Sequence, residues 1–340
     1  MRDPYDVATL VKGVISGSRP QIARAITLVE SSRPDHRERA RELLGELAGR
    51  NPDAVRVGIS GVPGAGKSTF IDALGVRLIA AGHKVAVLAV DPSSSRTGGS
   101  ILGDRTRMAA LTQRMEAFVR PSPSGGHLGG VARATRESML VLEAAGYDTV
   151  LVETVGVGQS EVAVAGMVDT FLMLALARSG DQLQGIKRGI LELVNVIAVN
   201  KADGDNEGEA RVTARELSIA MKLISSEAKT RRPPVIPCSA RTGMGLDEVW
   251  QAVLDHRAFL LANGDLAERR ADQQVEWLWA MVREEITNSM RRSPRALAAT
   301  PWVEEKIRAG RLSALDAVDE VMSAWAADVA ESGWRGCAQA

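Results

Sequence analysis

The sequence predicts an α/β fold in which a mostly parallel sheet is covered by helices on both faces. From Val55 onward, short apolar runs alternate with segments of helical periodicity, which is the pattern of repeated strand–helix units. A glycine-rich loop, Gly61–Ser68, follows the first of these runs directly. Because ligands bind such folds at the carboxyl ends of the strands, polar residues that end strands are the candidate functional residues.

Length and composition indicate a globular protein. With 340 residues the chain exceeds one small domain, and a core of about 200 residues with appendages is expected. The formal net charge is zero, from 42 basic and 42 acidic residues, which favours neither nucleic acid nor an anionic membrane as a partner. No apolar run approaches the roughly 20 residues that span a bilayer. Cys238 and Cys337 form neither a metal-ligand spacing nor a disulfide framework. We expect a cytoplasmic protein.

Residues 1–52 are expected to form an N-terminal helical segment. Val7, Leu10 and Val14 recur at helical spacing, and a second such pattern begins at Ile22. Pro34 separates these patterns from a further helix that ends near Gly49.

Residues 53–262 are expected to form the central domain with the sheet. The predicted strands are about 55–60, 84–90, 116–119, 148–153, 170–177, 194–199 and 234–238. The predicted helices are near 67–81, 101–112, 128–145, 182–191, 206–229 and 245–261.

Residues 263–340 are expected to form a C-terminal helical arm. Apolar residues from Val275 to Ile286 recur on one face of a long helix bounded by Pro294, and Thr300–Pro301 is expected to start a second, short helix that Gly310 ends. Ser313 with Asp316 opens a third helix. Five of the six tryptophans lie in this arm, at 277, 279, 302, 325 and 334. They fill the core of the arm itself or cover a homodimer interface, and the second interpretation is favoured.

The loop after the first strand has the pattern G-x-x-x-x-G-K-[ST] of a phosphate-binding loop, between a strand and a helix as that pattern requires. A glycine-rich turn that matches by chance is the alternative. Glycines let backbone N–H groups converge on phosphate oxygens, and Lys67 would reach the β- and γ-phosphates while Ser68 binds Mg²⁺. The predicted phosphate-binding residues are Gly61, Val62, Pro63, Gly64, Ala65, Gly66, Lys67, Ser68 and Thr69.

Two further strand ends carry acids suited to Mg²⁺. Asp91 follows the second strand, where it is either a metal-associated carboxylate or a turn residue before Pro92. The loop from Ser93 to Gly103 has the composition of a switch loop. Glu153 ends the fourth strand, and Gly156, three residues later, is placed to sense the γ-phosphate through its N–H group.

The segment Asn200-Lys201-Ala202-Asp203 predicts the base. An ionised Asp203 accepts two hydrogen bonds from guanine, whereas adenine has no matching donors and would leave the carboxylate unpaired. Asn200 would brace the loop and the stem of Lys201 would lie against the base. Ser239 and Ala240 end the last strand, and the Ala240 N–H group is expected to meet guanine O6. GTP is therefore the predicted nucleotide.

The polar, glycine-punctuated loop at 177–189 also follows a strand end. It is either a plain loop or a third nucleotide-responsive loop, in addition to the two that a small G protein has.

Together these motifs resemble the methylmalonyl-CoA mutase-associated G proteins, also called MeaB, ArgK or LAO/AO transport ATPases, of the SIMIBI class of P-loop GTPases. The resemblance covers essentially the whole chain, and its most specific parts are residues 91–94, 153–160 and 177–189. It implies a P-loop NTPase fold with a central G domain and a C-terminal dimerisation arm. It also implies GTP/GDP and Mg²⁺ as ligands, with no permanently bound cofactor.

The resemblance assigns roles to individual residues. Lys67 and Ser68 match the phosphate-loop pair, and Asn200, Lys201 and Asp203 match the guanine reader. The metal-associated acids are matched by Asp91, Asp104 and Glu153, and the catalytic third switch by Asp181, Gln184 and Lys187.

The resemblance further implies a chaperone of an adenosylcobalamin-dependent acyl-CoA mutase, foremost methylmalonyl-CoA mutase, whose cofactor delivery is gated by GTP hydrolysis. Val157 stands beside Gly156 where a water-positioning glutamine is usual, so slow intrinsic hydrolysis is expected. The alternatives are a kinase of amino-acid transport components, a metal-insertion GTPase and a nucleotide-bound adaptor. The four scattered histidines, at 36, 83, 127 and 256, argue against metal insertion.

Overall fold

The computed structural model describes residues 3–50, 53–90, 108–121, 128–154, 160–177, 188–224 and 231–336. The chain divides into two compact units, one up to Gln273 and one from Gln274 onward. The predicted domain limits, 1–52, 53–262 and 263–340, stay predictions, and the units are treated separately below.

The first unit is built on a seven-stranded sheet in which every neighbouring pair of strands is parallel. The strand order is β3-β2-β4-β1-β5-β6-β7, with the first strand in the middle. The parallel sheet confirms the predicted fold class. The strands are β1 Val55–Gly61, β2 Val85–Val90, β3 Ala117–Arg120, β4 Thr149–Thr154, β5 Thr170–Leu176, β6 Val196–Asn200 and β7 Val235–Pro237.

Helices lie between these strands, as parallel connections require. Within the described residues they overlap the predicted helices, except that α8 was not predicted. The helices are α1 Val7–Ile15, α2 Arg19–Glu30, α3 Pro34–Leu47, α4 Lys67–Ala80, α6 Ala109–Thr112, α7 Leu128–Ala144, α8 Ser160–Ala165, α10 Arg188–Leu191, α11 Glu207–Ile224, α12 Leu246–Asn263 and α13 Asp265–Arg292.

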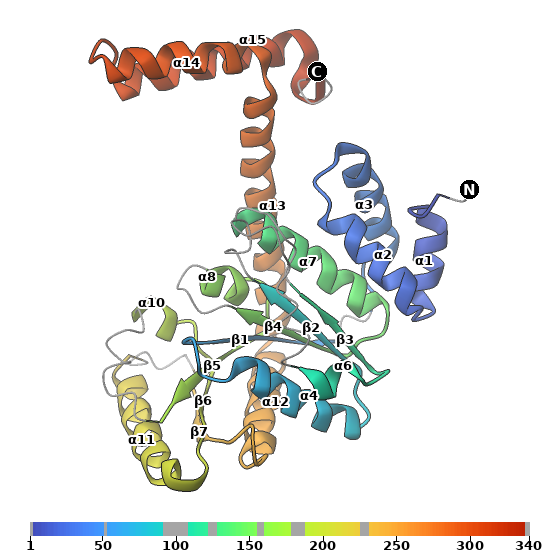
Figure 1. Ribbon diagram of the computed structural model, residues 1–340, viewed down its shortest axis with the longest axis vertical. Coiled ribbons are helices and arrows are strands. Elements are labelled where there is room, and N and C mark those ends of the chain that lie inside the picture. Colours follow the sequence, from blue (N-terminus) through green and yellow to red (C-terminus); the bar gives the residue numbers. More distant parts are fainter. Residues whose placement is uncertain are drawn as a thin grey trace. The chain divides into compact units, whose positions relative to one another are not determined.

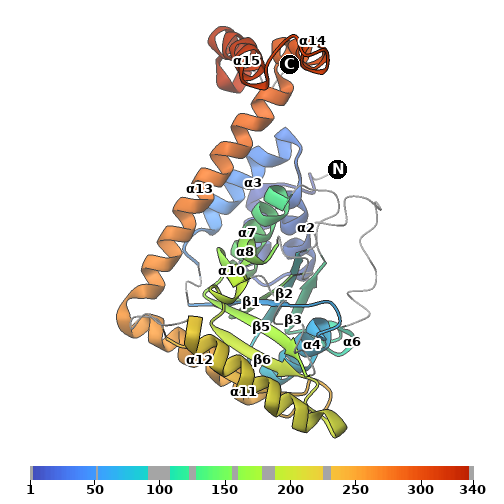
Figure 2. The same ribbon diagram turned by 90° about the vertical axis from the view of Figure 1, so that its left-hand side faces the viewer.

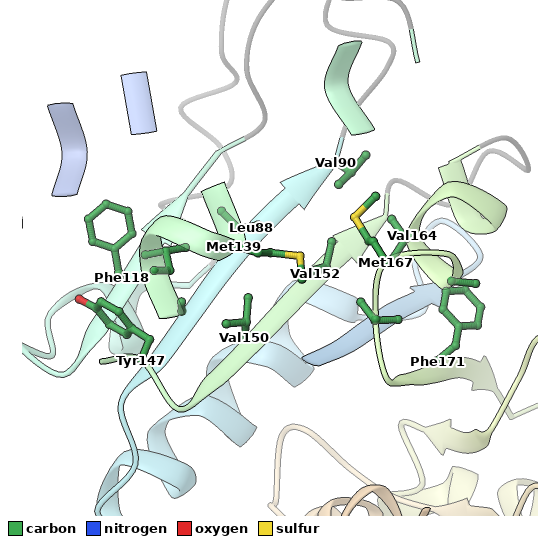
Figure 3. Packing of buried hydrophobic residues seen from close by; sticks show 14 of the residues in the cluster. Leu88, Val90, Phe118, Met139, Tyr147, Val150, Val152, Val164, Met167 and Phe171 are labelled. Carbon is green, nitrogen blue, oxygen red and sulfur yellow. The ribbon is translucent and has the colours of Figure 1, made fainter. Parts of the chain in front are cut away.

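Each face of the sheet has its own hydrophobic core, because successive residues of a strand point to opposite faces. In β4, Leu151 packs with α4, α6 and α12, whereas Val150 and Val152 pack on the other face with α7 and α8. Figure 2 shows α4 and α6 together on one side of the sheet and α7 on the other. Figure 3 shows the second core, with Met139 of α7 close to Val150 and Val152.

The N-terminal helices share that second core. Leu10, Ile22 and Leu43 are fully buried, and the three helices gather beside α7 (Figure 1). An ion pair strengthens the contact, since both Nη atoms of Arg37 donate to the buried carboxylate of Glu137, at 2.8 and 2.6 Å. The predicted N-terminal helices are thus confirmed, and they pack on the sheet domain rather than standing apart.

The second unit contains α13 from Gln274 onward. It also contains α14 Pro294–Arg308 and α15 Ala314–Gly336, which pack against each other. The predicted start of the second arm helix at Thr300–Pro301 is wrong, because Pro301 lies inside α14. The helix starts at Pro294, where a proline lacks only an N–H group that has no partner in a first turn, and Ser293 caps it by accepting from Ala296 N at 3.1 Å. Ser313 caps α15 by accepting from Asp316 N, also at 3.1 Å.

Within the described part of the chain, no helix has the length and apolar character needed to cross a bilayer.

Candidate nucleotide-binding site

The predicted phosphate loop joins the end of β1 to the start of α4. Its glycines are required by geometry at two positions at least. Gly66 has a φ of 85°, and a Cβ there would lie 2.9 Å from Asn200 Nδ2. Gly61 has a φ of 155°, and a Cβ there would lie 2.4 Å from the carbonyl oxygen of Leu174. Only glycine lets the loop take this path without displacing its neighbours.

Lys67 is buried at the start of α4, with 9% of its surface exposed. Its ammonium donates to the carbonyl oxygens of Gly61, at 2.7 Å, and Val62, at 3.4 Å. Burial lowers the pKa of Lys67, and the negative charges of Glu153 and Glu161 oppose that shift. The cation is thus held against its own loop by neutral oxygens, which a phosphate group can replace.

Ser68 and Glu153, 85 residues apart in sequence, lie in direct contact. The Ser68 hydroxyl donates to Glu153 Oε1 at 2.9 Å. Glu153 is the penultimate residue of β4, which lies beside β1, and it is 8% exposed. A hydroxyl and a carboxylate at the mouth of a phosphate loop are the hard oxygen ligands that suit Mg²⁺. These two residues therefore fit a magnesium ion bound with phosphates.

The predicted guanine reader adjoins the phosphate loop. Asn200, the last residue of β6, donates from Nδ2 to the carbonyl oxygen of Ala65 at 2.9 Å and accepts from Ala240 N at 3.1 Å. One buried side chain thus ties the phosphate loop to the segment after β7. A contact between Ala240 N and guanine O6, as predicted, would have to share or replace the bond to Asn200. Lys201 has a φ of 61°, which is unusual for a residue with a side chain and marks a tight turn.

Asp203 is held by its neighbour from the last strand end. The Ser239 hydroxyl donates to Asp203 Oδ2 at 2.5 Å and accepts from Thr242 N at 3.1 Å. A carboxylate has about four acceptor positions on its two oxygens, so this bond leaves room for two donors of a base. The carboxylate is therefore oriented before any ligand arrives.

The structure brings the described candidates together at the carboxyl edge of the sheet. Hydrogen bonds join Ser68 to Glu153, Asn200 to Ala65 and Ala240, and Ser239 to Asp203. Pro63, Gly64 and Thr69 are exposed at the phosphate loop. The remaining candidates, Asp91, Asp104, Gly156, Asp181, Gln184 and Lys187, lie outside the described residues.

Glu161 was missed in the sequence and belongs with this group. It lies in the first turn of α8 and is only 3% exposed. The available signal was an acid that precedes the apolar run Val162–Ala165 and lies eight positions after Glu153.

Comparison with known proteins agrees with this geometry. The family model described as methylmalonyl Co-A mutase-associated GTPase MeaB matches residues 22–295. A probable GTPase of Mycobacterium tuberculosis is 55% identical over 316 residues, which are 93% of each chain. A mitochondrial methylmalonic aciduria type A homolog of Mus musculus is 44% identical over 329 residues, covering 94% of this chain and 79% of the mouse protein.

A solved structure gives the same result. The crystal structure of a LAO/AO transport system kinase superimposes with a TM-score of 0.74 and 36% identity, covering 95% of this chain and 98% of that one. The family match, the identities and the phosphate-loop geometry together show that this chain is a P-loop GTPase of the MeaB family, the methylmalonyl Co-A mutase-associated GTPases.

Proposed function

We propose that this GTPase is a chaperone of an adenosylcobalamin-dependent acyl-CoA mutase, foremost methylmalonyl-CoA mutase. We propose that GTP hydrolysis gates delivery of the cofactor and protects or reactivates the mutase. The match to a family described as mutase-associated carries the proposal. The name of the mouse relative, which refers to methylmalonic aciduria, supports it.

In this proposal Lys67 exchanges the carbonyl oxygens of Gly61 and Val62 for the β- and γ-phosphates. Ser68 and Glu153 would hold Mg²⁺ with help from Asp91 and Asp104, and the ion would neutralise charge that develops on the phosphates. The backbone N–H groups of the loop and the N-terminal end of α4 add further positive potential. These groups act together because β1 and β4 are neighbours in the sheet.

Asp203 would select guanine. Its carboxylate is oriented by Ser239, and it would accept from guanine N1–H and from the 2-amino group. Asn200 would act through the loop, since its bonds to Ala65 and Ala240 fix the distance between the phosphate and base sites. Binding a purine that lacks these donors would leave the carboxylate desolvated and unpaired.

Stimulation by the mutase is assigned to the third switch. Gly156 would sense the γ-phosphate, and Asp181, Gln184 and Lys187 would respond to the mutase, with Lys187 supplying positive charge to the transition state. Lys187→Ala should leave the affinity for GTP intact and abolish the mutase-dependent increase in turnover. Unchanged stimulation would reject this role.

The deciding experiment measures GTP and ATP hydrolysis by the purified protein with and without a cobalamin-dependent mutase. The expected result is slow GTP hydrolysis that the mutase accelerates, with ATP a poor substrate. The Lys67→Ala variant with mutase is the control for contaminating GTPases. A rate that ignores the mutase, together with equal use of ATP, would reject the chaperone function.

A kinase of amino-acid transport components is the second candidate, because the similar solved structure is named a LAO/AO transport system kinase. It predicts transfer of labelled phosphate from the nucleotide to a protein acceptor, whereas the chaperone predicts release of all label as inorganic phosphate.

We further propose that residues 263–340 form a homodimerisation arm. Val275, Leu278, Trp279, Trp302 and Leu315 are exposed apolar side chains of this region, and such residues are often covered by a partner. Light scattering should give twice the monomer mass of 36.3 kDa. A monomeric mass at micromolar concentration would contradict the arm's role.

A further inference from the structure

We infer that Ser60 and Thr154 are positioning residues of the GTPase site, and that the hydrogen bond between their hydroxyls holds the Glu153 carboxylate where the Mg²⁺ of the nucleotide needs it. This inference rests on the proposed nucleotide and magnesium site. Thr154 directly follows Glu153 at the end of β4, and Ser60 directly precedes Gly61 at the end of β1. The two hydroxyls are therefore next to the metal-binding acid and to the phosphate loop.

The hydroxyl bond lies where the backbone pairing of β1 with β4 stops. That pairing ends at Ile59 and Glu153. One residue later, Ser60 pairs with β5 and Thr154 pairs with β2. The Thr154 hydroxyl donates to Ser60 Oγ at 3.0 Å, so a side-chain bond continues the contact between the two strands. The carboxyl ends of neighbouring strands are also where parallel sheets bind their ligands.

The hydroxyl bond and the bond from Ser68 to Glu153 lie on opposite faces of the sheet. Successive residues of a strand alternate between the faces. Glu153 lies on the face covered by α4, where it accepts from Ser68 at 2.9 Å, so Thr154 lies on the other face. Ser60 lies on that other face as well, since its neighbour Ile59 packs in the core beneath α4. The end of β4 is thus held from both faces.

Both hydroxyls are buried, since Thr154 is fully buried and Ser60 is 3% exposed. A buried hydroxyl that loses its partner is costly, whereas two apolar side chains of the same shape would pack here without that cost. Packing alone therefore does not require a serine and a threonine at these two positions. A requirement for the bond itself does.

The bond fixes the separation between the phosphate-binding and the metal-binding groups. Gly61, next to Ser60, provides the carbonyl oxygen that accepts from Lys67 at 2.7 Å. Glu153, next to Thr154, provides the carboxylate proposed for Mg²⁺. Because Mg²⁺ demands near-ideal octahedral geometry, a small displacement of this carboxylate weakens its binding. Loss of the bond should therefore weaken Mg²⁺ binding at the nucleotide and leave binding of the nucleotide alone almost unchanged.

The test measures how much Mg²⁺ the protein needs to retain GDP. The dissociation rate of a fluorescent GDP analogue is followed at increasing Mg²⁺, which gives a half-effective Mg²⁺ concentration for each variant. Thr154→Val keeps the shape of the side chain without the hydroxyl. It should raise this concentration about fivefold, the equivalent of one typical hydrogen bond, while the GDP affinity in EDTA changes less than twofold.

Two variants serve as controls for Thr154→Val. Thr154→Ser retains the hydroxyl and should stay near the wild-type concentration. Thr149→Val is the matched control, since Thr149 is also a fully buried threonine of β4, and its hydroxyl donates to Asp148 Oδ1 at 2.9 Å at the opposite end of the strand. It should leave the Mg²⁺ requirement unchanged.

The double variant Ser60→Ala/Thr154→Val separates positioning from stability. Thr154→Val leaves Ser60 Oγ without its donor and should lower the free energy of unfolding, and removing both hydroxyls should restore much of that loss. If the bond positions Glu153, the double variant still needs the higher Mg²⁺ concentration, because the link between β1 and β4 is absent. A Mg²⁺ requirement that returns to the wild-type value together with stability overturns the inference.

An unchanged Mg²⁺ requirement in Thr154→Val also overturns it. If Thr154→Val does not fold, Ser60→Ala repeats the measurement, and loss of folding in both single variants and in the double variant overturns the inference, because the pair would then serve stability alone. If GDP retention by the wild-type protein does not depend on Mg²⁺, the proposed magnesium site is rejected, and the inference falls with it.

Discussion

A buried cation lies near each end of β1, Arg56 at the amino end and Lys67 at the carboxyl end, but the two differ in how the charge is paired. Near the amino end, Arg56 binds both carboxylate oxygens of Glu143, at 2.5 and 2.8 Å, and Arg270 binds both oxygens of Asp169, at 2.8 and 2.6 Å. At the carboxyl end, the hydrogen bonds of Lys67 within the described structure go to neutral carbonyl oxygens.

The difference separates structural charge from functional charge. A guanidinium that makes two hydrogen bonds to one buried carboxylate already has its charge compensated, and breaking the pair leaves an uncompensated buried charge. A buried ammonium against carbonyl oxygens is poorly compensated in the resting protein, and an incoming phosphate improves its surroundings. The amino edge should therefore control stability and the carboxyl edge should control activity.

The largest effect is expected for Asp169→Asn at the amino edge. The side chain is fully buried, and it accepts from Arg56 N at 3.2 Å as well as from Arg270. Loss of its charge should lower the free energy of unfolding by about 3–5 kcal/mol, as measured by urea denaturation, while the folded protein keeps its GTP affinity.

Asp255→Asn provides the control for Asp169→Asn, because Asp255 is half exposed and lies 3.8 Å from Arg231. Its cost should stay below about 1 kcal/mol. If both variants lose equally little stability, the amino edge is not the stabilising region.

The second-largest effect is expected at the carboxyl edge, where a substitution should lower activity and leave stability intact. Lys67→Met should lower GTP turnover by about 10²–10³-fold, the usual cost of removing a preorganised group that meets developing charge. The free energy of unfolding should stay equal or rise, because a buried, desolvated cation is removed. Turnover and urea midpoints measured on one preparation check both statements, with exposed Lys222→Met as the control. A strongly destabilised Lys67→Met would remove the contrast between the two edges.

The third effect concerns base selection at the same edge. Asp203→Asn presents a donor where guanine also donates, so the preference for GTP over ATP should fall by roughly 2–4 kcal/mol. Competition of both nucleotides against a fluorescent GDP analogue measures the preference. A preserved preference would place the guanine reader elsewhere, and a loss of folding stability would make Asp203 a structural acid like Asp169.

Local patterns were sufficient to predict the fold. Apolar runs bounded by polar residues placed the strands within about two residues of their observed ends, because a strand buried on both faces is mostly apolar along its length. The same reasoning failed at Thr300–Pro301, since a proline inside α14 looks like a helix start when the cap at Ser293 is not recognised. The sequence pattern around Pro301 did not distinguish a proline inside a helix from a proline at a helix start.

The site was predictable where one motif contains its residues, and less so where distant segments meet. The phosphate loop and the N-K-x-D segment are contiguous and were identified directly. The bond from Asn200 to Ala65 spans 135 residues, and the burial of Glu161 depends on α8 lying against Gly58. The pairing of Arg270 with Asp169 likewise joins segments 101 residues apart. Such contacts depend on the register of the sheet and the docking of helices, which single-sequence patterns do not specify.

The smallest effect tests whether the amino edge tolerates additional charge. His256 is buried and shares a hydrogen bond of 2.9 Å with Thr170 Oγ1 at the start of β5. Burial, together with the positive charges of Arg269 and Arg231, lowers the pKa of His256 from 6.5 to about 4, against the opposing charge of Asp169.

The unfolded chain protonates His256 at a higher pH than the folded chain does. The contribution of neutral His256 to the free energy of unfolding is therefore intact above pH 6.5 and is lost as the pH falls towards 4. The loss should be about 2 kcal/mol, allowing for partial screening of the ring. His256→Gln keeps a hydrogen-bonding side chain without the titration, so its free energy of unfolding should decline less between pH 7 and pH 4.5. Parallel declines in the two proteins would show that protonation of His256 does not limit the stability of this edge.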